Sequence, residues 1–213
     1  MFTKDRTQIC SSVVGCFPDL ESLYHTIPRD ARSHMERVGG YADTLYHYMR
    51  KRDRELIDRE LGADFQRYSR KVFQMHDIGR HYIPVSILNK IEKLTDEEYQ
   101  TIKDHAINAT KAIDSIYKKP FPDDVMQQFY SIAVYHHERY DGGGYPLGLK
   151  GNDIPFGARI CAVADAYDGI TSWKPYKKRQ TARAEAVEII CRESGTQFDP
   201  YVIEMFRACA ALI

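Results

Sequence analysis

Helical periodicity runs along almost the whole of this sequence, and alternating strand patterns are scarce. The clearest example is residues 29–52, where the apolar residues at helix-like intervals are Met35, Val38, Leu45 and Tyr48. This spacing places apolar side chains on one face of a helix, whereas a half-buried strand would alternate at every second residue. The pattern therefore predicts an all-α fold, an orthogonally packed helical bundle without internal repeats.

Length and composition set the size of this bundle. With 213 residues, 43% of them hydrophobic, the chain can bury one substantial core but is short for two domains of average size. We expect an N-terminal extension over residues 1–28 and one functional domain over residues 29–213. Such a chain has little room for a sensor domain.

The charge balance gives no sign of a polyanionic partner. Lysine plus arginine and aspartate plus glutamate each total 30, so the formal net charge is zero. No global field attracts a nucleic-acid polymer or an anionic membrane, and any anionic ligand must be bound by local charge. No stretch of about 18 apolar residues predicts a membrane span, and the N-terminal residues are too polar for a signal peptide. We therefore expect a cytoplasmic protein.

Start and stop signals divide the chain into helices. Thr95 and Glu98 have the spacing of a capping box at the start of a helix. Pro122 and Pro155 each precede a further helix, since proline is well tolerated where a helix begins. Besides residues 29–52, the predicted helices cover residues 64–75, 95–117, 123–137, 155 through at least 168, 181–193 and 199–211.

Residues 141–154 hold five glycines and one proline, which is too many for a regular element. Gly143 and Gly144 allow the backbone to turn tightly and to approach a ligand. Tyr145 offers a ring for stacking and a hydroxyl for a phosphate. An ordinary surface loop is the alternative, and a glycine triplet alone would favour it. The histidine pair just before this segment favours a substrate-binding loop.

Seven residues that can bind a metal recur at the ends or inner faces of the predicted helices. They include two adjacent doublets, and adjacent helical residues point in different directions, so each doublet can reach a common site only where its helix ends or distorts. Solvation or a core hydrogen bond is the usual role of a solitary histidine, and we assign it to His25, His47 and His81. The seven candidate ligands are His34, His76, Asp77, His105, His136, His137 and Asp165.

This set of ligands predicts metal-assisted hydrolysis of a phosphoester. Imidazole suits iron, manganese, zinc and nickel, and a carboxylate can span two cations and offset their charge. Two cations about 3.5 to 4 Å apart can lower the pKa of a shared water and stabilise charge on the attacking and phosphoryl oxygens. Such a centre needs no serine or cysteine nucleophile.

Four motifs in order carry a family resemblance over residues 29–206. They are HDIGRHYIPVSILNK, LTDEEYQTIKDHA, HHERYDGGGYPLGLKGNDIPFGARICAVADAYDGITSWKPYK and SGTQFDP. Together they resemble the HD-GYP class of the HD phosphohydrolase superfamily. The resemblance implies the helical HD-domain fold and a centre of two or three divalent metals. It also implies hydrolysis of the bacterial second messenger cyclic di-GMP to pGpG or GMP by a hydroxide that bridges the metals.

The resemblance also assigns roles to the candidate ligands, with Asp77 as the bridge between two metals. The ligands of one metal would be His34, His76 and Asp165. The ligands of the other metal would be His105, His136 and His137. Family members with a third metal have a carboxylate one turn before the first histidine, and Asp30 holds that place here. Asp168, one turn beyond Asp165, either orients a metal-bound histidine or is an ordinary carboxylate on the helix face.

Three cations are placed near the substrate by the same resemblance. Arg80 takes the place of the lysine in the family's HDIGK and would act in catalysis together with Asp77. Lys174 and Lys177 resemble the phosphate-binding RPYR or RPYK of the family and would bind substrate with Tyr145. At position 80 the arginine is larger than the family's lysine and forked. At position 174 a lysine replaces the family's arginine and cannot make a bidentate contact. Both positions therefore bear on which substrate is bound.

Two alternatives to cyclic di-GMP hydrolysis remain open. Because Arg80 and Lys174 lie where phosphate or base would be recognised, the substrate could be another cyclic dinucleotide, such as cyclic GMP-AMP, or a nucleotide phosphoester. The other alternative is a receptor that binds a cyclic dinucleotide without hydrolysing it, although no ligand position is missing here. For the metal we expect iron or manganese, with nickel or zinc as alternatives. We expect regulation by a homodimer or by a separate sensor or receiver protein.

Overall fold

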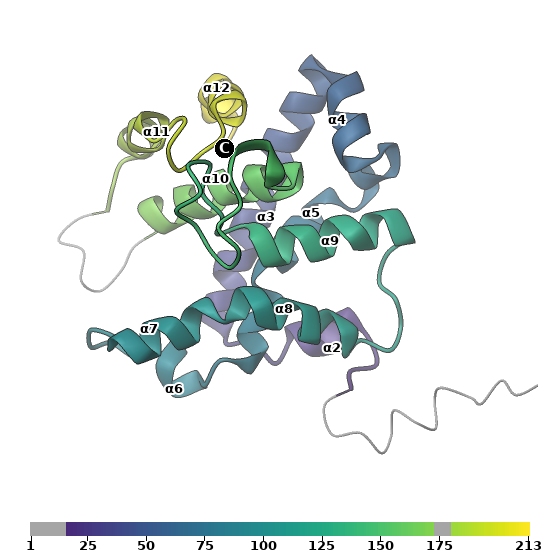
Figure 1. Ribbon diagram of the computed structural model, residues 1–213, viewed down its shortest axis with the longest axis vertical. Coiled ribbons are helices and arrows are strands. Elements are labelled where there is room, and N and C mark those ends of the chain that lie inside the picture. The colour runs from purple at the N-terminus through teal and green to yellow at the C-terminus, as the bar shows by residue number, and fades with distance from the viewer. Residues whose placement is uncertain (1–15, 173–179) are drawn as a thin grey trace, which may run out of the picture.

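The long helix α3 (Arg29–Arg52) forms the centre of the bundle (Figure 1). In the computed structural model, which describes residues 16–172 and 180–213, this helix packs mainly against α5 (Ser69–Gln74) and α10 (Phe156–Thr171). Its buried side chains include Met35, Val38 and Leu45, so the apolar period in the sequence marks the face that meets the core.

The remaining helices are shorter than α3. The α-helices are α2 (Leu20–Tyr24), α4 (Arg54–Leu61), α6 (Val85–Leu88), α7 (Asp96–Lys103), α8 (His105–Asp114), α9 (Asp123–Tyr135), α11 (Arg183–Arg192) and α12 (Pro200–Cys209). The 3-10 helices are η1 (Ala63–Arg67), η2 (Met75–Tyr82), η3 (Gly151–Asp153) and η4 (Ala210–Leu212). No strand occurs in the described ranges, which contain isolated β-bridges only. The predicted all-α fold is confirmed.

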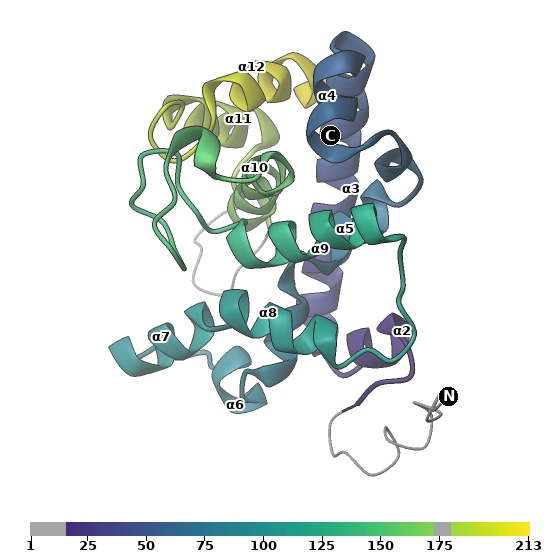
Figure 2. The ribbon, with the colours of Figure 1, turned by 45° about the vertical axis from the view of Figure 1, so that its right-hand side comes forward.

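The helices cross one another at steep angles. In both ribbon views α8 and α9 run across α3, and α11 and α12 cover α10 at the other end of the molecule (Figures 1 and 2). The 3-10 helix η2 lies between these layers, where it contacts α8, α9 and α3. Three helices therefore surround η2, which carries two of the candidate metal ligands, His76 and Asp77.

Aromatic side chains fill the core next to α3. The Tyr46 and Phe65 rings lie 5.3 Å apart, and the Phe65 and Phe73 rings 5.5 Å apart, both edge to face. All three side chains are fully buried. Edge-to-face pairs add about 0.5–1.5 kcal/mol each beyond the area that they bury. This cluster fixes α5 against α3 and so determines where η2 begins.

Two predicted helices differ from the structure. Residues 64–74 form most of η1 and all of α5, which Tyr68 separates, and Met75 begins η2. The predicted helix 95–117 is divided at Asp104 into α7 and α8, and His105 begins α8 instead of lying within one long helix. The predicted capping box of Thr95 and Glu98 is present. The break follows from the His105 ring, whose Nδ1 donates to the carbonyl of Ile102 at 2.6 Å and so competes with the backbone ladder.

Residues 16–28, within the predicted N-terminal extension, pack against the bundle. The backbone of Phe17 pairs with both Ser115 and Tyr117, at 2.8 Å in each case. The buried residues of this segment are Leu20, Leu23, Tyr24 and Ile27. A boundary between an extension and the functional domain near residue 28 stays a prediction.

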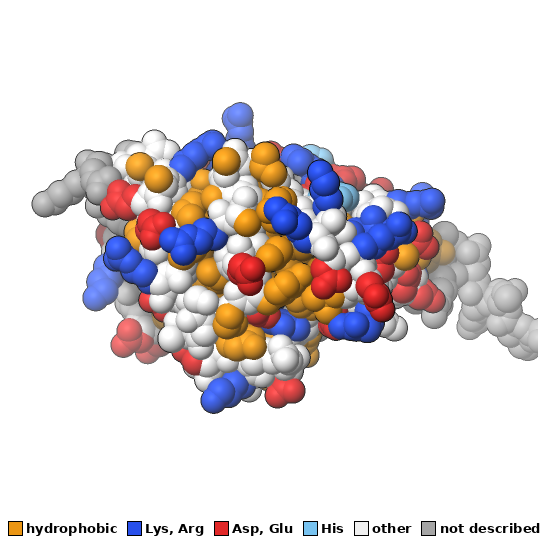
Figure 3. Space-filling model, turned by 90° about the horizontal axis from the view of Figure 1, so that it is seen from above, with side chains coloured by type: hydrophobic (Ala, Val, Ile, Leu, Met, Phe, Trp, Pro, Cys, Tyr) orange, Lys and Arg blue, Asp and Glu red, His pale blue; other side chains and the backbone are white. Residues whose placement is uncertain are grey.

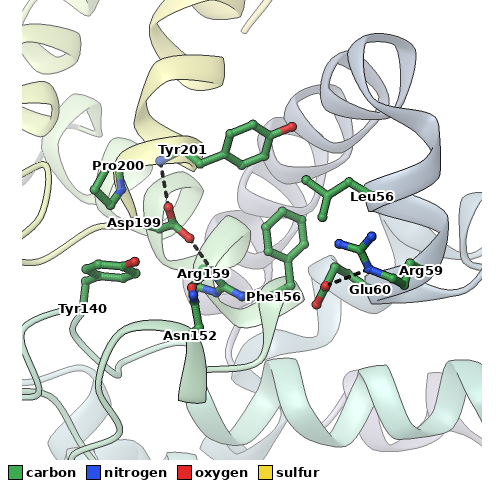
Figure 4. A pocket seen from close by; sticks show the side chains of 10 residues that line it. All are labelled: Leu56, Arg59, Glu60, Tyr140, Asn152, Phe156, Arg159, Asp199, Pro200 and Tyr201. Carbon is green, nitrogen blue, oxygen red and sulfur yellow. Dashed lines mark hydrogen bonds and ion pairs between the residues drawn. The ribbon is translucent and has the colours of Figure 1, made fainter.

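The face that carries α4, α11 and α12 shows hydrophobic side chains grouped among charged ones (Figure 3). A cavity of about 550 Å³ lies between α4, α10 and α12 (Figure 4). Its charged groups pair with one another, Arg159 with Asp199 at 2.5 Å and Arg59 with Glu60 at 3.6 Å. None of the candidate metal ligands lines it. No helix in the described ranges is long and apolar enough to cross a membrane.

Candidate metal centre

The structure brings all seven candidate ligands to one place. They come from elements far apart in the sequence, namely α3, η2, the start of α8, the end of α9 and α10. Two groups have all their ligand atoms within 4.8 Å of one another. The first is His34, His76 and Asp77, and the second is Asp77, His105, His136 and His137. The remaining candidate, Asp165, lies 3.1 Å from Nε2 of His34 and 4.0 Å from Nδ1 of His137.

Asp77 belongs to both groups and divides its two oxygens between them. Oδ1 lies 3.1 Å from Nε2 of His105 and 3.7 Å from Nε2 of His136. Oδ2 lies 3.5 Å from Nε2 of His34 and 3.4 Å from Nε2 of His76. The carboxylate is 1% exposed. One oxygen faces each histidine group, which is the arrangement that a carboxylate spanning two cations requires.

The backbone of η2 explains how adjacent residues reach one centre. Asp77 has φ −96° and ψ 17°, which interrupts the helical path just after His76. Gly79 then allows η2 to lie against α8, since a Cβ at this position would come within 2.0 Å of the carbonyl oxygen of His105 and 2.6 Å of the amide of Ala109. Both contacts are with backbone, which cannot give way. Gly79 therefore acts through close packing, and η2 continues past it to Tyr82.

Three of the histidine rings are fixed in one tautomer by their own helices. Each donates its Nδ1 hydrogen to a carbonyl three or four residues earlier, which leaves the Nε2 lone pair directed at Asp77. A ring held in this way is ready to bind a metal through Nε2. The contacts are His76 with Phe73 at 3.0 Å, His105 with Ile102 at 2.6 Å, and His136 with Ile132 at 3.1 Å.

His34 is oriented by a carboxylate instead. Its Nδ1 lies 2.7 Å from Oδ2 of Asp168, and Arg37 donates to both Asp168 oxygens at 2.6 and 3.0 Å. Burial raises the pKa of Asp168, but the bonds from His34 and Arg37 outweigh it and lower that pKa to about 2. Asp168 is therefore the partner that orients a candidate ligand, the first of the two roles considered. The role of Arg37 was missed, although its position one turn after His34 was a signal for it.

The titration behaviour of both carboxylates and of His137 favours their ligand forms. For His34, burial lowers the pKa, but the bonds with Asp165, Asp168 and Asp77 outweigh it and raise that pKa well above its usual value. Burial raises the pKa of Asp77, but the charge of Arg80 and two nearby histidines hold it well below its usual value. The pKa of Asp165 is lowered against burial chiefly by its bond with His34. Burial and the neighbouring histidines lower the pKa of His137 well below its usual range. At neutral pH both carboxylates are thus ionised and the His137 ring is neutral.

Several buried polar atoms here have no hydrogen-bond partner, namely Nε2 of His76 and both oxygens of Asp77. Arg80 lies 2.7 Å from Oδ2 of Asp77, but without the geometry of a hydrogen bond. Leaving such groups unsatisfied is costly, and divalent cations would satisfy them. The nitrogen and carboxylate donors suit iron, manganese, zinc or nickel. The residues present therefore fit a pair of divalent metals.

Asp30, the candidate for a third metal, lies in the first turn of α3 and is exposed. It belongs to neither group of clustered ligand atoms. Its place one turn before His34 supports a third site only as a proposal.

The glycine-rich loop lies directly against the centre. The ring of Tyr145 stacks on that of His137, with centroids 4.8 Å apart and planes inclined by 26°. A Cβ on Gly144 would come within 2.3 Å of the amide nitrogen of Arg139, so only glycine fits there. Gly143 donates its amide to Oδ1 of Asp141 at 2.9 Å. The loop therefore closes tightly and presents Tyr145 to the site.

Glu138 holds this loop from inside and was missed by the sequence analysis. Its carboxylate is 3% exposed and accepts hydrogen bonds from the amides of Leu147 at 2.7 Å and Leu149 at 3.0 Å. An acidic residue directly after the histidine pair was the available signal. The other predicted substrate contacts, Lys174 and Lys177, lie outside the described residues.

Comparison with known proteins agrees with this geometry. The family model described as HD domain matches residues 44–202. A probable cyclic di-GMP phosphodiesterase of Vibrio cholerae is 36% identical over 190 residues, which is 88% of this chain and 42% of the relative. A 3'3'-cGAMP-specific phosphodiesterase of the same species is 30% identical over 177 residues, which is 83% of this chain and 31% of that protein. The chain thus spans less than half the length of these curated relatives.

A solved structure supports the fold. It is an HDG"Y"P protein from Bdellovibrio bacteriovorus, which superimposes with a TM-score of 0.55 at 20% sequence identity. The superposition covers 85% of this chain and 52% of that one. At this level of identity the similarity establishes the helical fold alone.

Proposed function

This chain belongs to the HD domain family, in its HD-GYP class, and from that premise we propose that it is a metal-dependent phosphodiesterase that hydrolyses cyclic di-GMP to pGpG, GMP or both. The observation that carries the proposal is the position of Asp77, whose two oxygens face two separate histidine groups. The name of the relative that is 36% identical supports the choice of substrate.

The cofactor in this proposal is a pair of divalent cations. We expect iron or manganese, with nickel or zinc as alternatives. Asp77 would be shared by both cations. One would be held by His34, His76 and Asp165, and the other by His105, His136 and His137. When bound, such a pair supplies an activated water and stabilises charge on the phosphoryl oxygens. The proposal is for two cations, and a third with Asp30 among its ligands is the alternative to this pair.

The chain's own side chains would position the phosphodiester. Arg80 lies within 2.7 Å of Asp77, and its guanidinium can donate hydrogen bonds to a non-bridging oxygen of the phosphodiester. Tyr145 stacks on His137 and can donate its hydroxyl to the substrate, while Gly143 and Gly144 allow close approach of the loop. Asp168 keeps the His34 ring in place. We also propose that Lys174 and Lys177 bind a phosphate of the substrate, as the family resemblance implies.

A second candidate function is hydrolysis of another cyclic dinucleotide. It is favoured by the relative named as specific for 3'3'-cGAMP, which is 30% identical over most of this chain. Arginine at position 80 and lysine at position 174 differ from the family's usual residues where phosphate or base would be read. A direct comparison of the two substrates separates these functions.

The experiment is product analysis by chromatography. The protein is purified without oxygen, reconstituted separately with ferrous iron and with manganese, and incubated in parallel with cyclic di-GMP and with 3'3'-cyclic GMP-AMP. Faster turnover of cyclic di-GMP, with pGpG or GMP as product, supports the main proposal. Faster turnover of the hybrid dinucleotide favours the second candidate. Binding without turnover in metal-loaded protein would indicate a receptor and contradict both.

Location and assembly are further parts of the proposal. We propose that the chain acts in the cytoplasm, as a homodimer or with a separate sensor or receiver protein. Light scattering of the purified chain measures its mass in solution. A monomer at all concentrations would contradict the dimer and leave the separate regulator as the proposal.

A further inference from the structure

Lys103 lies beside the candidate metal centre, at the end of α7 and two residues before His105. Its ammonium nitrogen sits over two aromatic rings, 4.9 Å from the centroid of Tyr99 and 5.1 Å from that of Tyr145. Cations at this distance from a ring are attracted to its face. The two rings therefore hold the lysine side chain in a defined position, which is uncommon for a flexible lysine at a protein surface.

The position of Lys103 relates directly to the metal ligands. The same Tyr145 ring that contacts the ammonium stacks on the ring of His137, 4.8 Å away. His137, Tyr145, Lys103 and Tyr99 thus form a row of contacts that leads outward from the centre. Tyr99 at its outer end is 53% exposed. The ammonium lies one aromatic ring beyond the ligand shell, at the solvent side.

No carboxylate among the described residues pairs with Lys103. Among the residues that the structure describes, it forms no ion pair and no side-chain hydrogen bond, whereas Lys90, just before α7, is paired with Glu98 at 2.6 Å. A lysine that is held by rings and has no anionic partner can bind an anionic ligand without breaking an existing ion pair. The formal net charge of the chain is zero, so an anionic substrate depends on local cations such as this one.

We propose that Lys103 is a substrate-binding residue that contacts the phosphodiester that is not being cleaved. This inference rests on the proposed function, because a cyclic dinucleotide carries two phosphodiesters and only one can lie at the metals. Arg80, which is 2.7 Å from Asp77, serves the phosphate at the centre. Lys103, one ring farther out, serves the other phosphate. It thereby selects dinucleotides over substrates with a single phosphodiester.

The test compares two substrates in metal-loaded protein. Cyclic di-GMP has the second phosphodiester, and bis(4-nitrophenyl) phosphate has only one. Lys103→Met keeps an unbranched side chain that is one atom shorter and removes its charge. For cyclic di-GMP we expect KM to rise about tenfold or more, the usual effect of losing a charged hydrogen bond, with kcat within about twofold. For bis(4-nitrophenyl) phosphate we expect both constants to stay within about twofold of the unmodified protein.

Matched variants separate charge from structure. Lys111→Met removes an exposed lysine from α8 and should leave KM and kcat for both substrates unchanged. Lys103→Arg retains the cation and should restore most of the affinity for cyclic di-GMP. The metal content of every variant is measured in the same samples and should equal that of the unmodified protein. The KM for cyclic di-GMP should also depend less steeply on salt in Lys103→Met, because one screened charge contact is gone.

Three results would overturn the inference. They are an unchanged KM for cyclic di-GMP in Lys103→Met, an equal loss with both substrates, and a loss that follows the metal content. If the unmodified protein binds a cyclic dinucleotide without hydrolysing it, the proposed function fails, and the dissociation constant of Lys103→Met still decides the role of the lysine. If the unmodified protein neither binds nor hydrolyses either dinucleotide, both proposals are overturned.

Discussion

Nδ1 of His34 lies 2.7 Å from Oδ2 of Asp168, and this contact joins α3 to α10 at the edge of the candidate metal centre. Arg37 donates two further hydrogen bonds to the same carboxylate, which fix the position of the acceptor. The other nitrogen of the His34 ring is thereby directed toward Asp165 and Asp77. A carboxylate that orients a ligand in this way increases both the basicity of the ring and its affinity for a metal.

Replacing this carboxylate should weaken metal binding without removing a ligand. In Asp168→Asn the His34 ring loses its charged partner, and we expect the affinity for metal to fall about 10- to 100-fold. Turnover should drop at limiting metal and recover in large part at excess metal. Titration with manganese, followed by activity, measures both effects. The control is Asp58→Asn on α4, whose carboxylate pairs with Arg50 and not with a ligand, and equal metal affinity in the two variants would contradict the role of Asp168.

Gly79 should tolerate no larger residue. The Cβ of Gly79→Ala would meet the backbone of His105 at 2.0 Å, so η2 and α8 must move apart. We expect a loss of about 1–3 kcal/mol, or more, in the free energy of unfolding, measured with urea. Gly169→Ala is the matched control, because an added Cβ there meets no described residue within 4 Å and alanine is the better helix former. Equal stability of the two variants would show that η2 and α8 are not packed as described.

Glu138 should determine the order of the glycine-rich loop. In Glu138→Gln only one acceptor oxygen remains for the amides of Leu147 and Leu149, and the new amide group opposes the second donor. We expect these two amides to exchange with deuterium faster than in the unmodified protein, as followed by mass spectrometry of the loop peptide. Since the loop carries Tyr145, kcat/KM should fall as well. Unchanged protection of the loop would rule out this anchoring role.

Arg80 should act through its charge. Arg80→Met removes the only guanidinium within reach of Asp77 Oδ2 among the described residues, and we expect kcat to fall about 100-fold, as for other lost contacts to a developing charge. Arg80→Lys retains a cation and should keep activity within about tenfold of the unmodified protein. Steady-state kinetics with saturating metal gives both values. A loss in Arg80→Lys as large as in Arg80→Met would mean that the forked shape matters more than the charge.

The sequence was informative wherever a signal was local. The apolar period of residues 29–52 predicted α3, and the Thr95 capping box predicted the start of α7, since both depend on residues within a few positions. The doublets of candidate ligands could also be recognised, because each stands at the end of a predicted helix. For the same reason the all-α fold followed from periodicity alone.

What the sequence did not provide depends on distant contacts. His34 and Asp168 are 134 residues apart, so only the packing of α3 on α10 shows that one orients the other. The need for glycine at position 79 likewise follows from the approach of α8. The break at Asp104 involves a local bond, from the His105 ring to the carbonyl of Ile102, which the apolar period does not show either. A periodic pattern contains no information on such contacts, which explains why helix boundaries near the site were the weakest predictions.

The most direct test of the metal centre is to measure metal content and turnover in the same samples of the unmodified protein and of Asp77→Asn. Asparagine keeps the shape of the side chain but removes the charge that faces both histidine groups. The unmodified protein should bind about two equivalents of iron or manganese and hydrolyse cyclic di-GMP. Asp77→Asn should bind less than about one equivalent and show no turnover, with its helix content unchanged. If Asp77→Asn retained two equivalents of metal and full activity, the account of Asp77 as the bridging residue would be wrong.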